Sequence, residues 1–297
     1  MQQSPLTLND NVMLVESFSV EEICDSYKKM GINVSSYFKD LNAIDLFECI
    51  DTGYRFYSPF TTIGDATFYE ELSKKRENYY SNRWEHNVTL NQLDSTDNVL
   101  EVGSGFGTFL NLLKSINIKA KGLELNPHAV KKCIESGLDV QEKLIQEEAK
   151  VNTEKYSVVC YFQVLEHITE VNDFLKSSID ALKPNGKLII GVPNNNPYLF
   201  ISDKYHTLNL PPHHAGLWNK KSLKALESIF SLKLITMEFE SLEYTYEYFL
   251  SVQIESSNIL NRIILKTFKK IMPKMLKKVI CKFINGRNVL AVYKKVD

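Results

Sequence analysis

Several features common to exported, membrane-spanning or metal-binding chains are missing from this 297-residue sequence. Its first residues, MQQSPLTLND, lack a basic stretch followed by an apolar core. No apolar run approaches the length of about 20 residues that crosses a bilayer. The five cysteines include no Cys-x-x-Cys pair, which fits free thiols in a reducing compartment and gives no zinc signature. We therefore expect a cytoplasmic protein.

Acidic residues are almost absent from the C-terminal end of the chain. Residues 256–297 contain 11 basic residues and one acidic residue, a formal charge of +10. Residues 1–255 contain 24 basic and 35 acidic residues, a formal charge of −11. A largely acidic chain is a poor match for nucleic acid, and the basic end lacks the interleaved aromatic residues that stack on bases. We therefore expect no nucleic acid as a partner. The basic end either meets a different partner or balances the rest of the chain.

The middle of the chain alternates strand-like and helix-like patterns. This alternation predicts an α/β fold with a doubly wound, mostly parallel seven-stranded sheet, whose ligand site lies beyond the carboxyl ends of the strands. We place this domain at 91–297 and an accessory segment at 1–90. Strands are predicted over 98–102, 119–125, 137–141, 156–162, 187–194, 232–241 and 288–296, and helices over 106–116, 127–136, 171–182 and 217–230.

The stretch LEVGSGFGT, which ends at Thr108, joins the first of these strands to its helix through three glycines. A P-loop is excluded because Gly-Lys-Ser and Gly-Lys-Thr do not occur, and a dinucleotide fingerprint is incomplete because Thr108 stands where its third glycine belongs. Glu101 precedes the turn. Glu124 lies 21 residues after Gly103, at the end of the next predicted strand, where a carboxylate can accept hydrogen bonds from ribose hydroxyls.

Together with QVLEHI at 163–168 and LKPNGKLIIGVPN at 182–194, these residues resemble the class I S-adenosylmethionine-dependent methyltransferases. The resemblance covers roughly residues 98–230. It implies a methyltransferase with a Rossmann-like fold and S-adenosyl-L-methionine as its cofactor, with Glu101 near the amino group of the cofactor and Glu124 on its ribose. The cofactor-binding residues that it implies are Glu101, Gly103, Ser104, Gly105, Gly107, Glu124, Leu125, Gln163 and Val164.

Methyl transfer to an alcohol requires in-line placement of the acceptor and removal of its proton, for which histidine is the usual base. We rank His213 and His214, in NLPPHHAGLW, first as catalytic residues because similar methyltransferases carry a histidine there; His167 and then His86 follow. His213 and His214, beside two prolines, could instead tie their loop to backbone carbonyls, and His167 could cap or pack its helix. We expect O-methylation of a saccharide or another small molecule. N-methylation of an amino sugar and a non-catalytic cofactor-binding partner protein remain alternatives.

The accessory segment at 1–90 is rich in aromatic residues, with 12 among the 48 residues from Tyr37 to Trp84. Such rings either pack a small core or present faces to an acceptor such as a sugar. Ser19 and Glu22 form a capping-box pattern before a short helix. The stretch FECIDTGYRFYSP resembles half of a small zinc-binding module, but Thr52 replaces its second cysteine, so we expect no metal there.

A second unusual segment lies between the last two predicted strands, at 244–287, where this family usually has a simple hairpin. Apolar residues recur there at helical spacing and lysines fill the other face, while Pro273 would bend or split the helix. A basic amphipathic helix such as 262–284 either lies peripherally on the inner face of an anionic membrane, which suits a lipid-linked acceptor, or packs on its own domain or on a second copy in a homodimer. The apolar positions are Phe268, Ile271, Met272, Met275, Leu276, Val279, Ile280 and Phe283.

Overall fold

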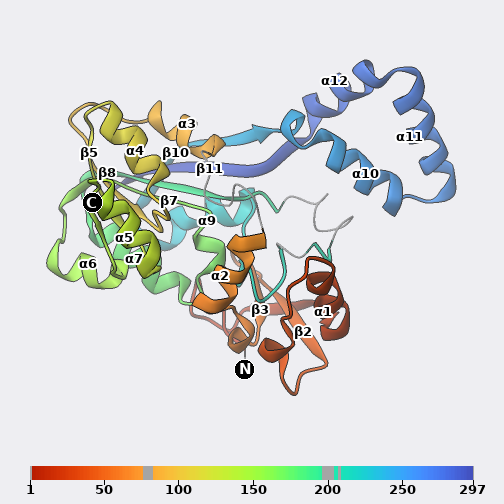
Figure 1. Cartoon of the computed structure of the whole chain (residues 1–297), viewed down its shortest axis with the longest axis horizontal. Coiled ribbons are helices and arrows are strands. Elements are labelled where there is room, and N and C mark those ends of the chain that lie inside the picture. The colour runs from red at the N-terminus through yellow and green to blue at the C-terminus, as the bar shows by residue number, and fades with distance from the viewer. Residues whose placement is uncertain (1, 76–82, 196–203, 207–208, 297) are drawn as a thin grey trace.

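The computed structural model describes residues 2–75, 83–195, 204–206 and 209–296, and a seven-stranded sheet forms its centre (Figure 1). The strand order is β10-β11-β8-β7-β4-β5-β6. β11 is antiparallel to both of its neighbours, whereas the strands from β8 to β6 are parallel, so the predicted mostly parallel sheet is confirmed. The strands are β4 (Asn98–Val102), β5 (Lys119–Leu123), β6 (Val140–Gln141), β7 (Tyr156–Phe162), β8 (Leu182–Pro193), β10 (Leu232–Ser241) and β11 (Asn285–Lys295).

Several predicted boundaries are wrong. Leu217, predicted as the first residue of a helix, lies in the short strand Gly216–Leu217, and the strand predicted over 137–141 covers only Val140–Gln141. Leu182, predicted as the end of a helix, begins β8, because it pairs with Tyr156 of β7. The last strand begins at Asn285 rather than at residue 288, because Asn285 pairs with Ser241 of β10. The insertion between these strands therefore ends three residues earlier than the sequence pattern predicted.

Helices cover both faces of the sheet. Successive side chains of a strand point to opposite faces, and in the central strands the side chains on both faces are apolar and pack against helices. In β7, Val158 packs in the cluster that includes side chains of α3 and α4, whereas Val159 packs in the cluster that includes side chains of α6, α7 and α9. α3 falls within the segment assigned to the accessory region at 1–90, yet it packs on the large sheet. The helices are α3 (Trp84–Leu90), α4 (Thr108–Ser115), α5 (Pro127–Glu135), α6 (Ile145–Val151), α7 (Val171–Asp180) and α9 (Lys220–Ile229).

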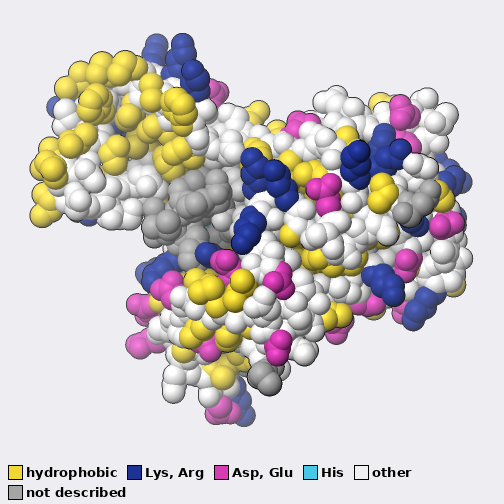
Figure 2. Space-filling view, turned by 180° about the vertical axis from the view of Figure 1, so that it is seen from behind, with side chains coloured by type: hydrophobic (Ala, Val, Ile, Leu, Met, Phe, Trp, Pro, Cys, Tyr) yellow, Lys and Arg dark blue, Asp and Glu magenta, His cyan; other side chains and the backbone are white. Residues whose placement is uncertain are grey.

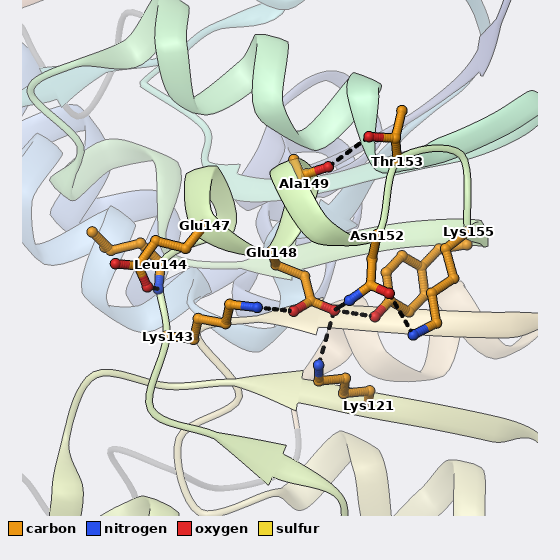
Figure 3. Close-up of polar contacts among 10 residues, drawn as sticks. Lys121, Lys143, Leu144, Glu147, Glu148, Ala149, Asn152, Thr153 and Lys155 are labelled. Carbon is orange, nitrogen blue, oxygen red and sulfur yellow. Dashed lines mark hydrogen bonds and ion pairs between the residues drawn. The ribbon is translucent and has the colours of Figure 1, made fainter.

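Glu148 attaches α6 to the sheet through a network of ion pairs and hydrogen bonds (Figure 3). Its fully buried carboxylate accepts hydrogen bonds from Lys121 and Lys143, each at 2.8 Å, from the side-chain amide of Asn152 at 2.8 Å, and from the hydroxyl of Tyr156. Burial raises the pKa of Glu148, but these hydrogen bonds outweigh it and lower the pKa to about 2. The carboxylate is therefore charged at neutral pH and joins β5, α6 and β7.

The N-terminal segment forms a second sheet of order β1-β2-β3-β9, in which β9 comes from the C-terminal half of the chain. Ser19 caps α1 by accepting a hydrogen bond from the amide of Glu22, which confirms the Ser19 half of the predicted capping box. The elements of this region are β1 (Val12–Ser19), α1 (Val20–Lys29), β2 (Ala43–Cys49), β3 (Arg55–Ser58), α2 (Ala66–Lys75) and β9 (Gly216–Leu217).

Aromatic rings form much of the core of this N-terminal region. Phe38, Tyr57 and Phe68 are at most 3% exposed and pack in one cluster with Tyr27. The small-core interpretation is confirmed for these rings, while the presentation of rings to an acceptor stays a prediction. All five cysteines are free thiols. Cys49 is the last residue of β2 and Thr52 lies in the turn that follows, where the absence of zinc stays a prediction.

A helical arm, shown in blue in Figure 1, extends from the edge of the large sheet between β10 and β11. It consists of α10 (Tyr246–Ser256), α11 (Ile259–Ile271) and α12 (Pro273–Phe283), so Pro273 splits the predicted helix in two. Leu276 and Ile280 pack against a satellite core on α10. No helix in the part of the chain that the structure describes is long and apolar enough to cross a membrane.

Candidate active site

The glycine turn links β4 to α4 at the carboxyl edge of the large sheet. Gly103, Gly105 and Gly107 have φ angles of +74°, +52° and +73°, the left-handed region that favours glycine. The amides of Gly103 and Ser104 both donate to the carbonyl of Leu123, at 2.8 and 3.0 Å. The turn therefore joins the ends of two adjacent parallel strands, and its glycines leave the backbone open to close approach.

Glu124, directly after β5, turns its carboxylate onto this loop. Its Oε2 accepts a hydrogen bond from the amide of Gly105 at 2.7 Å, and its Oε1 accepts from the amides of Leu125 and Asn126 at 2.8 and 2.9 Å. A carboxylate oxygen has two lone pairs, so Oε2 can also accept from a ligand hydroxyl. Leu125 is 58% exposed beside it and offers an apolar surface. This arrangement suits the recognition of a ribose and its attached base.

Glu101 is the buried acid on β4, just before the turn. Its side chain is 3% exposed, and its Oε2 has no hydrogen-bond partner within the described ranges. Burial, followed by the charge of Glu124, raises the pKa of Glu101 well above its usual range. A buried carboxylate oxygen without a partner is costly, and an ammonium group placed against it would offset that cost. The two acids and the glycine turn therefore fit S-adenosyl-L-methionine, which carries both an amino group and a ribose.

Gln163 and Val164 follow β7, next to the glycine turn. An added Cβ at Gly103 would lie 2.5 Å from Cγ2 of Val164, so the valine closes one side of the turn. The side-chain amide of Gln163 instead donates to Glu85 of α3 at 2.7 Å, and burial raises the pKa of this carboxyl. Sequence reasoning missed Glu85, although it stands beside His86 in the stretch NRWEHN.

Three of the histidines singled out in the sequence come together at the same edge of the sheet. His167 ends the short helix η3 (Leu165–His167) after β7, and His213 and His214 precede β9. The ring centroids are 4.8 Å apart for His167 and His213, 5.0 Å for His167 and His214, and 4.5 Å for the stacked neighbouring pair. One nitrogen from each ring lies within 4.8 Å of the others, a spacing that a metal ion could also use.

The N-terminal region holds the loop that carries His213 and His214. β9 pairs with β3, where Gly216 stands opposite Phe56, and Gly64 donates from its amide to the carbonyl of Pro212 at 2.8 Å. Tyr27 donates its hydroxyl to the carbonyl of Leu210 at 3.0 Å. Both histidines are buried, at 5% and 3% exposure. The position of the histidine pair therefore depends on the folding of the N-terminal region.

His167 has a defined tautomer, because the carbonyl of His213 can only accept a hydrogen bond. Nδ1 of His167 lies 2.6 Å from that carbonyl oxygen and 3.1 Å from the hydroxyl oxygen of Tyr69, which also donates to the same carbonyl at 3.0 Å. The proton is therefore on Nδ1, and Nε2 carries the lone pair. Burial lowers the pKa of His167 to about 4, so this ring is neutral near pH 7.

Buried polar groups that the sequence analysis missed lie close to these histidines. Both carboxylate oxygens of Glu166 are without a hydrogen-bond partner among the residues that the structure covers, and Oε1 is 3.9 Å from Nε2 of His167. Burial raises the pKa of Glu166 to about 8, so the carboxyl is largely protonated at neutral pH. The only sequence signal for it was its position in QVLEHI.

His86 has a different environment from the other three. Its ring packs between Phe109 and Phe162, with centroid distances of 5.2 and 5.0 Å, and its Nδ1 accepts a hydrogen bond from the amide of Arg83 at the start of α3. Burial lowers its pKa to about 4. These contacts suit a residue that caps and packs α3.

Comparisons with known proteins agree with this geometry. A family described as a methyltransferase domain matches residues 75–232, a range that contains the glycine turn and the three clustered histidines. The ubiquinone biosynthesis O-methyltransferase of Pseudomonas fluorescens (strain SBW25) is 26% identical over 155 residues, which cover 45% of this chain and 67% of that protein. Its counterpart from Pseudomonas savastanoi pv. phaseolicola is 30% identical over 123 residues, which cover 38% of this chain and 53% of that protein.

A solved structure shows the same fold. An S-adenosylmethionine-dependent methyltransferase from Archaeoglobus fulgidus superimposes with a TM-score of 0.53 at 19% sequence identity, covering 78% of this chain and all of that protein.

Proposed function

The chain belongs to the class I S-adenosylmethionine-dependent methyltransferases, and from that premise we propose that it methylates a hydroxyl group of a saccharide or another small-molecule acceptor. The observation that carries the proposal is the cluster formed by His167, His213 and His214. One member, His167, donates its amide to the carbonyl of Val164 at 2.9 Å, and Val164 closes one side of the glycine turn. The similarity to O-methyltransferases supports oxygen as the acceptor atom.

An acceptor hydroxyl must be placed in line with the methyl group, and it must also lose its proton to a base. S-adenosyl-L-methionine supplies a methyl group on a positively charged sulfur, which leaves as a neutral thioether. One of the imidazoles of His213 and His214 accepts the hydroxyl proton of the acceptor while the acceptor oxygen bonds to the methyl carbon. The pKa of about 4 makes His167 a weaker proton acceptor, so its role is to position the loop by donating to the carbonyl of His213.

Burial of these groups supports their part in group transfer. His213 and His214 are at most 5% exposed, and the ring centroids of Phe68 and Tyr69 lie 6.2 and 5.9 Å from that of His213. Hydrogen bonds and charge interactions are stronger where water is excluded, so a buried imidazole held in a fixed position interacts more strongly with a bound acceptor. Tyr69 is only partly buried, so its ring can meet the apolar face of a sugar ring, which supports a saccharide acceptor.

Labelled methyl transfer tests this proposal directly. Purified protein and S-adenosyl-L-methionine with a ¹³C methyl group are incubated with acceptor pools from cells, divided into free saccharides, lipid-linked glycans and other small molecules. We expect a methyl carbon bonded to oxygen in the NMR spectrum of the product. A product methylated on nitrogen would favour the amino-sugar alternative. Tight cofactor binding without any product from these pools would favour a non-catalytic partner protein.

A further inference from the structure

The outer face of α11 and α12 is apolar and uncovered. Neither helix contains a buried residue, and only Leu265, Leu276, Ile280 and Cys281 are partly buried against α10 and its neighbours. Within the described chain the other large apolar side chains of these helices are 37–77% exposed. Figure 2 shows them as one broad patch, which we call the arm face: Ile259, Leu260, Ile263, Ile264, Phe268, Ile271, Met272, Met275, Val279 and Phe283.

The arm face is continuous across the break at Pro273. Leu260, Ile264, Phe268 and Ile271 follow one another at spacings of three or four residues, and the pattern resumes with Met275 and continues to Val279 and Phe283. Scattered exposed apolar residues are normal on a protein surface, but a contiguous patch of this kind marks a surface that another phase or partner covers.

The charges around the arm face have one sign. Residues 256–287 contain nine basic residues and no acidic residue. Lys266, Lys270, Lys274 and Lys278 are exposed, and Lys269 pairs with Glu247 of α10 at 3.0 Å. Two copies of the chain that met face to face through their arms would bring these like charges together. An anionic surface with an apolar interior offers counter-charges to the lysines and a water-free region to the apolar side chains.

We propose that the arm lies in the interface of an anionic lipid bilayer, with the arm face in the boundary between headgroups and acyl chains. The lysines extend along the helices so that their stems stay on the apolar surface while their ammonium groups meet lipid phosphates. The arm is a surface anchor, since neither helix is long enough to cross a bilayer. This inference concerns membrane contact and does not depend on the proposed methyl acceptor.

The root of the arm lies beside the edge of the sheet that carries the site. The amide of Asn194, directly after β8, donates to the carbonyl of Arg287 at 2.7 Å, and the guanidinium of Arg287 stands 5.1 Å from the ring centre of Tyr248 in α10. Membrane contact through the arm therefore keeps this edge close to the bilayer. If the proposed function holds, an amphiphilic acceptor with its head outside the bilayer becomes the expected substrate class.

Vesicle flotation with the full chain tests the proposal. We expect the protein to float with vesicles of phosphatidylcholine and phosphatidylglycerol at low salt, and much less with phosphatidylcholine alone or at high salt. Replacing Lys266, Lys270, Lys274 and Lys278 by Gln is expected to weaken binding roughly several hundredfold, about fivefold for each charge. The matched control replaces four exposed lysines away from the arm by Gln: Lys131, Lys150, Lys183 and Lys224.

A second pair of variants isolates the apolar part. Ile263→Ser with Phe268→Ser is expected to abolish flotation, whereas Ile134→Ser with Val151→Ser, at similarly exposed sites on α5 and α6, leaves it unchanged. Unchanged S-adenosylhomocysteine binding in every variant shows that each one is folded.

Equal flotation with neutral and anionic vesicles, or none with either, would overturn the proposal. So would a dimer in sedimentation velocity without lipid that only the arm variants dissociate, because a second copy would then cover the arm face. A failure to find a methyl acceptor leaves the vesicle result intact.

Discussion

Gly103→Ala tests the geometry of the glycine turn most sharply. The φ angle of +74° at this position costs alanine about 1 kcal/mol relative to glycine. The new methyl group would also lie 2.5 Å from Cγ2 of Val164, far inside van der Waals contact, and relief of such overpacking costs about 1–3 kcal/mol. We therefore expect the free energy of unfolding to fall by about 2–4 kcal/mol in urea denaturation, with weaker binding of S-adenosylhomocysteine by calorimetry.

Two further variants separate the cost of the positive φ angle at Gly103 from the cost of the steric clash with Val164. Gly137→Ala has a similar φ angle of +68°, but its Cβ would meet only the flexible end of Lys114 at 3.2 Å, so the expected loss is about 1 kcal/mol. Val164→Ala removes the Cγ2 that blocks Gly103→Ala, so the double variant should be more stable than the two separate losses imply. Strictly additive losses, or a Gly103→Ala protein as stable as the parent with unchanged ligand affinity, would refute this description of the turn.

Three other perturbations have defined outcomes. Glu148→Gln leaves Lys121 and Lys143, only 12% and 21% exposed, without their counter-charge, and should cost about 3 kcal/mol of unfolding free energy at pH 7. Because the folded pKa of Glu148 is about 2 and its ordinary value is 4.5, this difference between parent and variant should persist above pH 4.5 and shrink as the pH falls toward 2 in urea titrations. Glu101→Gln replaces a buried carboxyl, whose pKa is raised because its charged form is costly there, with a neutral amide, so the ligand-free protein should become more stable at pH 7 while calorimetry shows roughly tenfold to hundredfold weaker S-adenosylmethionine binding. Dialysis against a chelator should leave labelled methyl transfer unchanged; loss of activity that zinc restores would instead make the three histidines metal ligands.

The large sheet could be predicted because its signals are local. The segment 156–162 is β7, a run in which every residue but Ser157 is buried. The segment 232–241 is β10, whose apolar residues Leu232, Leu234, Met237 and Phe239 pack on the main core between polar ones. The three glycines predicted the turn because only glycine adopts those φ angles without cost. Leu182 was placed wrongly because its apolar character suits the end of a helix as well as the start of a strand.

The surroundings of the candidate site could not be predicted, because they depend on contacts between distant segments. β9 is only two residues long and becomes a strand by pairing with β3, more than 150 residues earlier in the chain. The approach of His167 to His213 depends on that pairing and on Tyr69 from α2. The hydrogen bond between Gln163 and Glu85 likewise joins two segments 78 residues apart, and the local sequence pattern of neither segment predicts the contact.

The most direct test of the central claim compares methyl transfer and cofactor affinity in His213→Ala and His214→Ala, with the acceptor pool that gives product and with S-adenosylhomocysteine calorimetry. Imidazole base catalysis predicts that at least one variant transfers methyl groups roughly a hundredfold or more slowly. Its affinity for S-adenosylhomocysteine should stay close to that of the parent protein. Equal losses of transfer and affinity in both variants, or full transfer by both, would contradict a catalytic role for this histidine pair.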